Sequence, residues 1–343
     1  MPKITVGIPV YNAMPYLPES MESILRQSYA DFEILVINDG SSDDSLEYLN
    51  SISDPRLRLL SQSNQGLTTT LNRMLSEART PWLVRQDADD VSYQHRLLRI
   101  AEYIGKHPEA GMFYSLADYY PSASIGQFRS NRGTPEQLRQ IVNSGYLLSI
   151  CHTSVTLNVE KTLALGGYRF NLHVEDRDLW WRMAIFHDIR FIPEATVGFR
   201  QNSQSISSVN LAEQWLNGLY VQYLLLSHLW KLEPLPIETV RVALARMINI
   251  RKLRSKQHLR AFNMEWGRGN RSKAALEAAL AFALSPVSLM RRVTDELSSD
   301  GRITVGESPQ LFARLNSLLW AADQKSKAAC FNPSNSILCK DRS

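Results

Sequence analysis

The chain has 343 residues, of which 44% are hydrophobic and 21% charged, so it can bury a large core and is not a disordered protein. Its net charge of +4 is too small by itself to indicate nucleic acid binding, and we expect no nucleic acid partner. Its three cysteines lack the spacing of a metal site, and an odd number fits no disulfide framework, which favours a reducing compartment. The first residues lack the long apolar segment of a secretory signal, and no run of about 18 apolar residues occurs. We therefore expect a cytoplasmic protein.

Apolar strands and amphipathic helices alternate in the first third of the chain. The expected strands span residues 4–10, 32–37, 57–60, 82–86 and 112–117, and the expected helices span 14–28, 42–51, 66–78 and 93–106. Strands that are apolar throughout and are separated by helices indicate a parallel sheet that is covered on both faces. The fold class is therefore α/β, with a doubly wound, mostly parallel central sheet and flanking helices.

The pattern changes after residue 118. We expect helices over 135–143, 159–165 and 175–186 and strands over 150–158 and 191–199, and from 212 onward the chain is almost wholly helical. These features suggest an α/β domain over 1–210, a helical C-terminal extension over 211–330 and a flexible tail over 331–343.

Positive charge is concentrated in one segment. Residues 241–273 carry ten Lys or Arg and one Glu, or +9, and residues 274–343 carry +1, so residues 1–240 must hold +4 − 9 − 1 = −6. Such a run is either a solvated helix face or a patch for an anionic partner. In the second case, we expect residues 241–273 to make peripheral contact with an anionic membrane at its inner face, or with an anionic acceptor.

Polar residues follow three of the expected strands. Tyr11 and Asn12 follow the first strand, residues 38–43 the second and residues 87–90 the fourth. Ligands bind at the carboxyl ends of the strands in open α/β sheets, so we expect these side chains at one edge. Ordinary turn chemistry explains such residues after a single strand. The three acids within 87–90, however, would repel one another unless a divalent cation bound them, and we favour a metal site over a solvated loop.

Six segments form an ordered series: VGIPVYN, FEILVINDGSSDDS, SNQGLTTTLNRML, RQDADDVSYQHRL, CHTSVTLNVEKTLALGGYRF and VEDRDLWWRMA. This series resembles the inverting glycosyltransferases of family 2, which have the GT-A fold and include bacterial enzymes of surface-polysaccharide synthesis. The resemblance covers about residues 3–208, and its specificity comes from the order and spacing of the segments rather than from any one of them.

The resemblance implies a donor site. Asp39 resembles the acid that holds the uracil or ribose of the nucleotide. The residues on the donor side are Pro9, Tyr11, Asn12, Asp39, Arg85 and Asp87. Asp89 stands at the second position of the Asp-x-Asp motif, whose carboxylate meets Mn²⁺ or Mg²⁺, and Asp87 and Asp90 are further candidate ligands. Where the family often has a metal-binding His, this chain has Asn202. Its amide oxygen is a weaker ligand, so this loop either binds the metal loosely or contacts phosphate only through Arg200.

The resemblance also implies a catalytic base and an acceptor side. Asp176 resembles the base, with Glu175 as its competitor, and Arg182 lies on the same helix. Without the resemblance, Asp176 would be an ordinary acid at a helix start. The candidates on the acceptor side are His152, Gly167, Glu175 and Trp180. The residues alone favour a core histidine at 152, a helix stop at 167 and a core indole at 180.

These assignments predict a glycosyltransferase that moves a sugar from a nucleotide-diphosphate sugar to a hydroxyl of a glycan or lipid-linked acceptor. We favour a UDP-sugar as the donor. The reaction would be a single displacement in which a metal stabilises the leaving diphosphate and Asp176 takes the proton. The alternative is a non-catalytic nucleotide-sugar-binding subunit of a polysaccharide assembly system. A sugar-1-phosphate nucleotidyltransferase ranks lower, because residues 11–14 lack a glycine-rich basic loop.

Overall fold

The computed structural model describes residues 4–121, 126–200, 211–287, 290, 303–315 and 319. Its strands are β1 (Ile4–Val10), β2 (Phe32–Asn38), β3 (Leu57–Ser61), β4 (Trp82–Arg85), β5 (Val91–Ser92), β6 (Met112–Tyr120), β7 (Val155–Asn158) and β8 (Ile189–Arg200). The helices among these strands are α1 (Leu17–Leu25), α2 (Ser45–Ser51), α3 (Leu67–Glu77), α4 (Arg96–Lys106), α5 (Pro135–Asn143), α6 (Val159–Ala164) and α7 (Glu175–Phe186). The helices that follow are α9 (Leu211–Leu229), α10 (Ile237–Ala245), α11 (Ile250–Gly267), α12 (Arg271–Leu284) and α14 (Pro309–Arg314).

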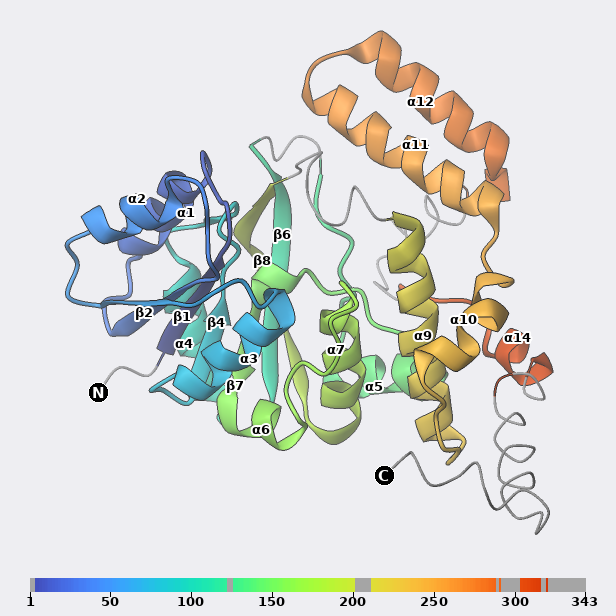
Figure 1. The fold of residues 1–343 in the computed structure, drawn as a ribbon, viewed down its shortest axis with the longest axis horizontal. Coiled ribbons are helices and arrows are strands. Elements are labelled where there is room, and N and C mark those ends of the chain that lie inside the picture. The colour runs from blue at the N-terminus through green and yellow to red at the C-terminus, as the bar shows by residue number, and fades with distance from the viewer. Residues whose placement is uncertain are drawn as a thin grey trace, which may run out of the picture.

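The strands form one mixed sheet in the order β3-β2-β1-β4-β7-β6-β8-β5 (Figure 1). The first four strands in this order are parallel, as are β6 and β8. Strand β7 is antiparallel to both β4 and β6, and β5 is antiparallel to β8. The predicted α/β class with flanking helices and a helical C-terminal part is confirmed, and the parallel arrangement is strongest in the half of the sheet that contains β1 to β4.

Both faces of this parallel half are buried. Along β2, Ile34 and Val36 belong to the core that α1, α2 and α4 cover, whereas Leu35 and Ile37 belong to the opposite core, which includes residues of α3. Successive side chains of a strand point to opposite faces, so burial on both sides requires an unbroken apolar run. This is why the strand could be predicted from composition alone.

The strand expected over 150–158 is only half right. His152–Ser154 form a turn of 3₁₀ helix, and β7 begins at Val155. The backbone N and the Oγ of Ser154 both donate to the carbonyl of Cys151, at 3.0 and 2.8 Å. Serine side chains compete with strand pairing in this way, and the resulting turn brings His152 to the edge of the sheet.

The C-terminal helices differ in how they meet the sheet. Helix α9 contributes Leu216, Leu219 and Leu225 to the same core as α3 and α7. We keep the boundary near residue 210 as a proposal about chain organisation. Figure 1 shows α11 and α12 as a hairpin that projects from the rest of the molecule, held by bonds such as Ser255 Oγ to the carbonyl of Ala281 (2.8 Å). Within the described part of the chain, no helix combines the length and apolar character needed to cross a membrane.

Candidate functional site

The loop after β1 is fixed against the loop after β2. Asn12 adopts a left-handed conformation (φ 47°), which asparagine tolerates better than most residues. Its backbone N donates to Ser41 Oγ (3.0 Å), and its side-chain oxygen accepts from Ser42 N (2.8 Å). Tyr11 beside it is 52% exposed, whereas Pro9 is buried within β1. Of the donor-side candidates Pro9, Tyr11 and Asn12, the last two are therefore the ones accessible to a ligand.

Asp39 is buried and organises the loop that precedes α3. One carboxylate oxygen accepts from Gln62 Nε2 (2.7 Å) and Gln65 N (2.9 Å), and the other accepts from Gly66 N (2.9 Å). A carboxylate has about four acceptor positions, so these three bonds leave one position for a donor group of a ligand. The structure thus gives Asp39 a structural role that the sequence did not predict, and this role is compatible with contact to a nucleotide.

Arg85 and Asp87 form a buried pair at the end of β4. Arg85 is 1% exposed, and its guanidinium donates to Asp87 Oδ1 (2.5 Å) and to the carbonyl of Gln86 (2.6 Å). The backbone N of Asp87 donates to Thr153 Oγ1 at 3.2 Å. Arg85 and Asp87, the pair predicted to lie at the donor site, are therefore fixed by bonds to β4 and to the turn that carries His152.

A second buried arginine supports this pair, and sequence reasoning gave it no role. Arg96 of α4 donates to Gln86 Oε1 and Ser92 Oγ, both at 2.8 Å, and to the carbonyls of Arg85 (2.8 Å) and Thr153 (2.5 Å). Burial lowers the pKa of Arg96 to about 10. Arg96 lies within the segment RQDADDVSYQHRL, a few residues after the three acids. Its position in that segment is the one feature of the sequence that could have indicated a role for it.

Burial and mutual repulsion disfavour the ionised forms of two acids after β4. Burial first, and then the neighbouring Asp87 carboxylate, raise the pKa of Asp89 to about 6. The pKa of Asp90 lies well above its usual range because of burial and of both neighbouring acids. Asp90 Oδ1 accepts from Arg200 N at 2.7 Å. Asp90 thus supports the loop, which leaves Asp89 as the half-buried carboxylate that a cation would stabilise most directly.

Whether a divalent cation fits here depends on the donor set. No group of three or more His, Cys, Asp or Glu side chains is arranged for a metal within the described residues, and Asn202 lies outside them. Mg²⁺, however, is usually held by one or two carboxylates together with substrate phosphates. The raised pKa of Asp89 marks a carboxylate that lacks full compensation by positive charge. The residues present therefore fit a cation that the protein shares with a diphosphate.

Arg200 closes one side of this loop. Its Nε donates to the carbonyl of Asp89 (2.7 Å), and its guanidinium lies 4.7 Å from the ring centres of both Tyr16 and Tyr120. It also pairs with Glu19. Arg200 therefore places a positive charge next to the Asp89 loop, where we expected it to meet phosphate.

Two carboxylates stand at the start of α7, and the charge of Arg85 acts on one of them, Glu175. Glu175 is only 5% exposed, and burial, followed by the charge of Asp176, raises its pKa to about 7. Asp176 is half-buried, and its Oδ1 accepts from Arg177 N (2.8 Å). The pKa of His152 falls to about 4 because of burial and the charge of Arg85, against the opposing influence of Asp176. Arg85, His152 and both α7 acids thus share one electrostatic environment.

His152 lies in this group, but Trp180 does not reach a ligand. Nitrogen Nε2 of His152 lies 3.0 Å from the hydroxyl of Tyr168, and the His152 ring meets the edge of the Trp180 ring at 5.7 Å between centres. Trp180 has 0% exposed surface, so the prediction that it contacts the acceptor is wrong. Its indole packs against the His152 ring.

Gly167 is also a packing residue in this structure. A Cβ at Gly167 would lie 2.4 Å from Asn72 Oδ1, and its φ of +60° favours glycine. Its carbonyl accepts from Arg182 Nη2 (2.7 Å), and Arg182 pairs with the fully buried Asp178 (2.7 Å), which also pairs with Arg169. This network fixes α7 and thereby the position of its first residues, and the place of Gly167 beside the acceptor stays a prediction.

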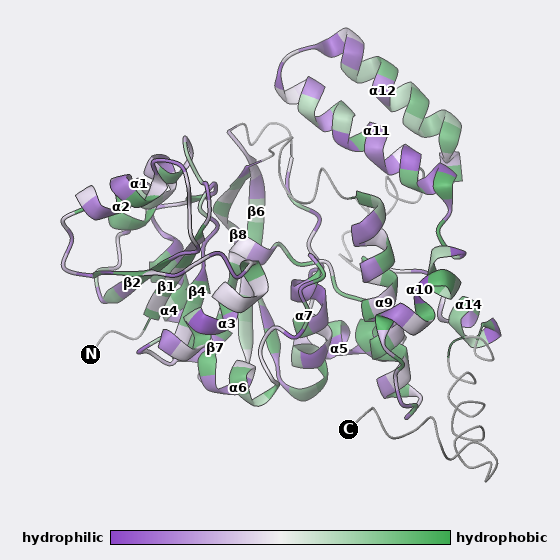
Figure 2. Ribbon diagram, in the orientation of Figure 1, coloured by the Kyte–Doolittle hydropathy of each residue, from purple (hydrophilic) through white to green (hydrophobic). Residues whose placement is uncertain are grey.

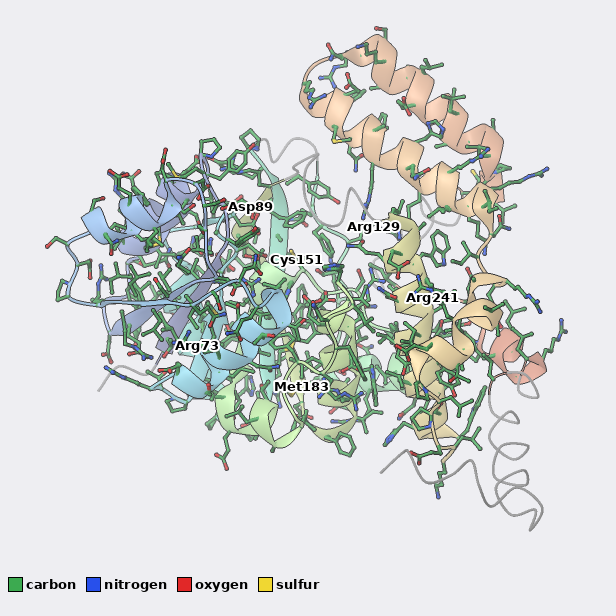
Figure 3. All side chains as sticks on the ribbon, viewed as in Figure 1. Arg73, Asp89, Arg129, Cys151, Met183 and Arg241 are labelled. Carbon is green, nitrogen blue, oxygen red and sulfur yellow. The ribbon has the colours of Figure 1, made fainter. Side chains whose placement is uncertain are left out.

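The donor-side groups follow the carboxyl ends of β1, β2 and β4, and the two acids stand at the start of α7, whereas Arg96 belongs to α4 and Arg200 ends β8. Figure 3 shows Asp89 toward the upper end of the sheet and Met183 of α7 toward the opposite end. Asp39 and Asp89 were expected at one edge; each follows the carboxyl end of a strand of the parallel half, since β2 and β4 both pair parallel with β1. The arrangement gathers several carboxylates and two arginines, Arg85 and Arg200, around one end of the sheet.

Comparisons with known proteins agree on one family. Residues 5–160 match the model of glycosyl transferase family 2. The chain is 31% identical over 189 residues to EpsE of Bacillus subtilis strain 168, a protein with a provisional glycosyltransferase name. That match covers 53% of this chain and 66% of EpsE, so it spans just under two thirds of that relative.

Solved structures are similar in fold. Residues 1–349 of S. aureus TarS in complex with UDP-GlcNAc match with a TM-score of 0.53 and 16% identity, over 80% of this chain and 89% of that one. The mannosyltransferase PcManGT from Pyrobaculum calidifontis in complex with GDP-Man and Mn²⁺ matches with a TM-score of 0.50 and 17% identity, over 93% and 88%. At such identities these likenesses concern the fold alone.

Proposed function

This chain belongs to glycosyltransferase family 2 and has the GT-A fold, and on that premise we propose that it is an inverting enzyme of polysaccharide synthesis. In this proposal it moves a sugar from a nucleoside diphosphate, with UDP as our first choice, to a hydroxyl of a glycan or lipid-linked acceptor. The observation that carries the proposal is the shared environment of Asp89, Arg85 and the two acids of α7.

In the proposed mechanism, Asp176 takes the proton of the attacking acceptor hydroxyl. It is the more accessible of the two α7 acids. Glu175, whose pKa is about 7, would hold its proton for much of the time at neutral pH and in that form could not accept another. Attack on the face opposite the leaving group inverts the anomeric centre in one step.

The leaving diphosphate requires positive charge. Asp89 would hold Mn²⁺ or Mg²⁺ jointly with the diphosphate, and such an ion supplies Lewis-acid stabilisation of the departing oxygen. Arg200, next to the Asp89 loop, would supply a fixed positive charge, and Asp39 and Asn12 would orient the nucleotide. A complex with GDP-Man and Mn²⁺ is known for the similar PcManGT fold, and a complex with UDP-GlcNAc for TarS, which supports this class of donor.

We also propose peripheral contact with an anionic membrane. The basic segment 241–273 spans part of α10, all of α11 and the start of α12. Helix α12 adds exposed apolar side chains, among them Leu276 at 59% and Phe282 at 50%. Figure 2 shows the corresponding contrast between a largely hydrophobic α12 and a more hydrophilic α11. Apolar insertion combined with basic charge is the usual means by which helices bind to membrane surfaces.

Thermal unfolding in the presence of a panel of UDP- and GDP-sugars, each with and without Mn²⁺, tests the proposed function. A true donor stabilises the folded protein by mass action, and we expect one nucleotide sugar to raise the melting temperature only with the metal. Slow hydrolysis of that donor, followed by NMR of the released sugar, would support an enzyme. Binding without hydrolysis or transfer would favour a non-catalytic binding subunit, and no binding of any nucleotide sugar would contradict both.

A further inference from the structure

Tyr168 is a buried tyrosine in the loop between α6 and α7, and its exposed fraction is only 2%. The amide of Asn72 in α3 binds both polar groups of its backbone. Asn72 Nδ2 donates to the Tyr168 carbonyl (2.7 Å), and Tyr168 N donates to Asn72 Oδ1 (2.9 Å). Gly167 leaves the room that this amide needs, since a Cβ there would lie 2.4 Å from Asn72 Oδ1. The backbone of Tyr168 is therefore fixed from α3.

The hydroxyl of Tyr168 meets the ring of His152. Its oxygen lies 3.0 Å from His152 Nε2, and within the described part of the chain this hydroxyl makes no second hydrogen bond. The ring centres of Tyr168 and Trp180 lie 5.6 and 5.7 Å from the centre of the His152 ring. Two neighbouring rings and one hydrogen bond thus hold the imidazole in one orientation.

The chemistry of this pair favours one tautomer of His152. Burial raises the pKa of Tyr168, and burial together with the charge of Arg85 lowers the pKa of His152 to about 4, so both groups are neutral at neutral pH. A neutral imidazole has one N–H donor and one acceptor nitrogen. If Nε2 carried the proton, the buried hydroxyl of Tyr168 would have no acceptor among the described residues, and such an unmade bond is costly. The hydroxyl therefore donates to Nε2, and the proton of His152 lies on Nδ1.

Nitrogen Nδ1 of His152 is open to a ligand. It makes no hydrogen bond to any described residue, yet it is not one of the fully buried polar atoms that lack a partner. The residue as a whole is half-buried. The charges of Asp176 and Asp87 both act on its ring, so the ring lies within the electrostatic reach of the proposed base and of the donor side. An N–H at this position can donate to an oxygen of a bound molecule.

We propose that Tyr168 is a positioning residue of the acceptor site: its hydroxyl donates to His152 Nε2 and thereby keeps His152 Nδ1 as a hydrogen-bond donor to an oxygen of the acceptor. The inference rests on the proposed function and deepens it, because it gives His152 the role of a neutral donor and leaves removal of the proton to Asp176. A sugar hydroxyl fits such a site, since its oxygen can accept from Nδ1 while its own proton passes to a carboxylate.

Nitrogen NMR of the ligand-free full chain, with ¹⁵N in its histidine rings, tests the tautomer at neutral pH. His152→Phe identifies the signals of this ring. We expect the wild type to carry the proton on Nδ1, and Tyr168→Phe, which removes only the hydroxyl, to lose this preference. Tyr114→Phe is the matched control, because Tyr114 is also buried and its hydroxyl donates to the carbonyl of Asn131 (2.9 Å).

A proton on Nε2 in the wild type, or an unchanged tautomer in Tyr168→Phe, would overturn the proposal. The same tautomer in Tyr114→Phe as in the wild type supports it. This measurement uses no nucleotide sugar, so a failure of the proposed function is distinguishable from a failure of this inference. Circular dichroism confirms that each variant is folded.

Release of the nucleoside diphosphate from the donor that the thermal panel identifies, with methyl glycosides as acceptors, tests the contact itself. We expect Tyr168→Phe and His152→Phe each to raise KM for the acceptor by about tenfold, because one hydrogen bond is lost, and to leave KM for the donor unchanged. The double variant should be no worse than His152→Phe alone, since the hydroxyl acts through His152. A raised KM for the donor, additive losses, or an equal loss in Tyr114→Phe would overturn the proposal.

Discussion

The edge of the sheet and the α11–α12 hairpin differ in what they bury. The edge of the sheet buries charged side chains, whereas the hairpin exposes apolar ones. At the sheet edge, Arg85, Arg96 and Asp178 are buried and bonded in networks. In the hairpin, Leu276 and Phe282 are 59% and 50% exposed. Buried charges persist only when they are well paired, so the first region is built to hold a fixed geometry. Exposed apolar surface of this kind marks contact with a partner or a membrane.

Among the variants, loss of the proposed base should reduce activity most. Such a loss would show that the edge of the sheet is the catalytic region. We expect Asp176→Asn to lower kcat by about 10²–10⁴-fold, because general base catalysis contributes that much, whereas donor binding should be retained. Steady-state kinetics and donor titration check both parts. Glu175→Gln is the control in the adjacent position, and equal losses in the two variants would contradict the assignment.

Removal of a buried supporting charge should be the next largest effect. Arg96→Ala leaves the acceptors on Gln86, Ser92, Arg85 and Thr153 without their donor, so we expect a loss of at least about 3 kcal/mol in the free energy of unfolding. Arg99→Ala on the same helix is the comparison, because Arg99 makes surface ion pairs that contribute about 1 kcal/mol or less. Chemical denaturation measures both variants. If both variants lost a similar free energy of unfolding, the buried hydrogen bonds of Arg96 would not be an important source of stability.

The strands and helices of the sheet domain could be predicted from the sequence, because the spacing of apolar residues and the length of apolar runs depend directly on which side chains are buried. It also predicted that acids would gather after β4. Periodicity could not show that Asp39 holds the loop before α3, since its partners lie 23 to 27 residues away. The burial of Trp180 and the network of Arg96 also depend on tertiary packing. Residues as distant as Arg177 and Glu307 line one common cavity, and no local pattern encodes that proximity.

The pH dependence of stability should report on Glu175. Its folded pKa is about 7, against an ordinary value of 4.5, so the folded protein holds this proton where the unfolded chain has lost it. This contribution to stability is full below pH 4.5 and disappears as the pH rises through 7. We expect Glu175→Gln to raise the melting temperature by a few degrees at pH 8 and by much less at pH 5. Melting curves that differ equally at both values would refute this.

The hairpin should tolerate substitution with the smallest effect on folding. We expect the double variant Leu276→Ser, Leu280→Ser to change the free energy of unfolding by only about 0.5 kcal/mol, as is usual for exposed positions. The same variant should bind anionic phospholipid vesicles about tenfold more weakly, since it loses apolar surface that enters the membrane. Vesicle sedimentation at low salt measures this. Unchanged vesicle binding would assign the exposed apolar face to some other contact.

The central claim is that Asp89 holds a cation that the leaving diphosphate shares. Calorimetric titration of UDP with and without Mn²⁺ tests it, with Asp89→Ala and with Asp44→Ala as the control, because Asp44 is exposed near the same edge. We expect Mn²⁺ to strengthen UDP binding in the wild type and in Asp44→Ala, and to have no effect in Asp89→Ala. A Mn²⁺-dependent gain in affinity that survives in Asp89→Ala would contradict the account.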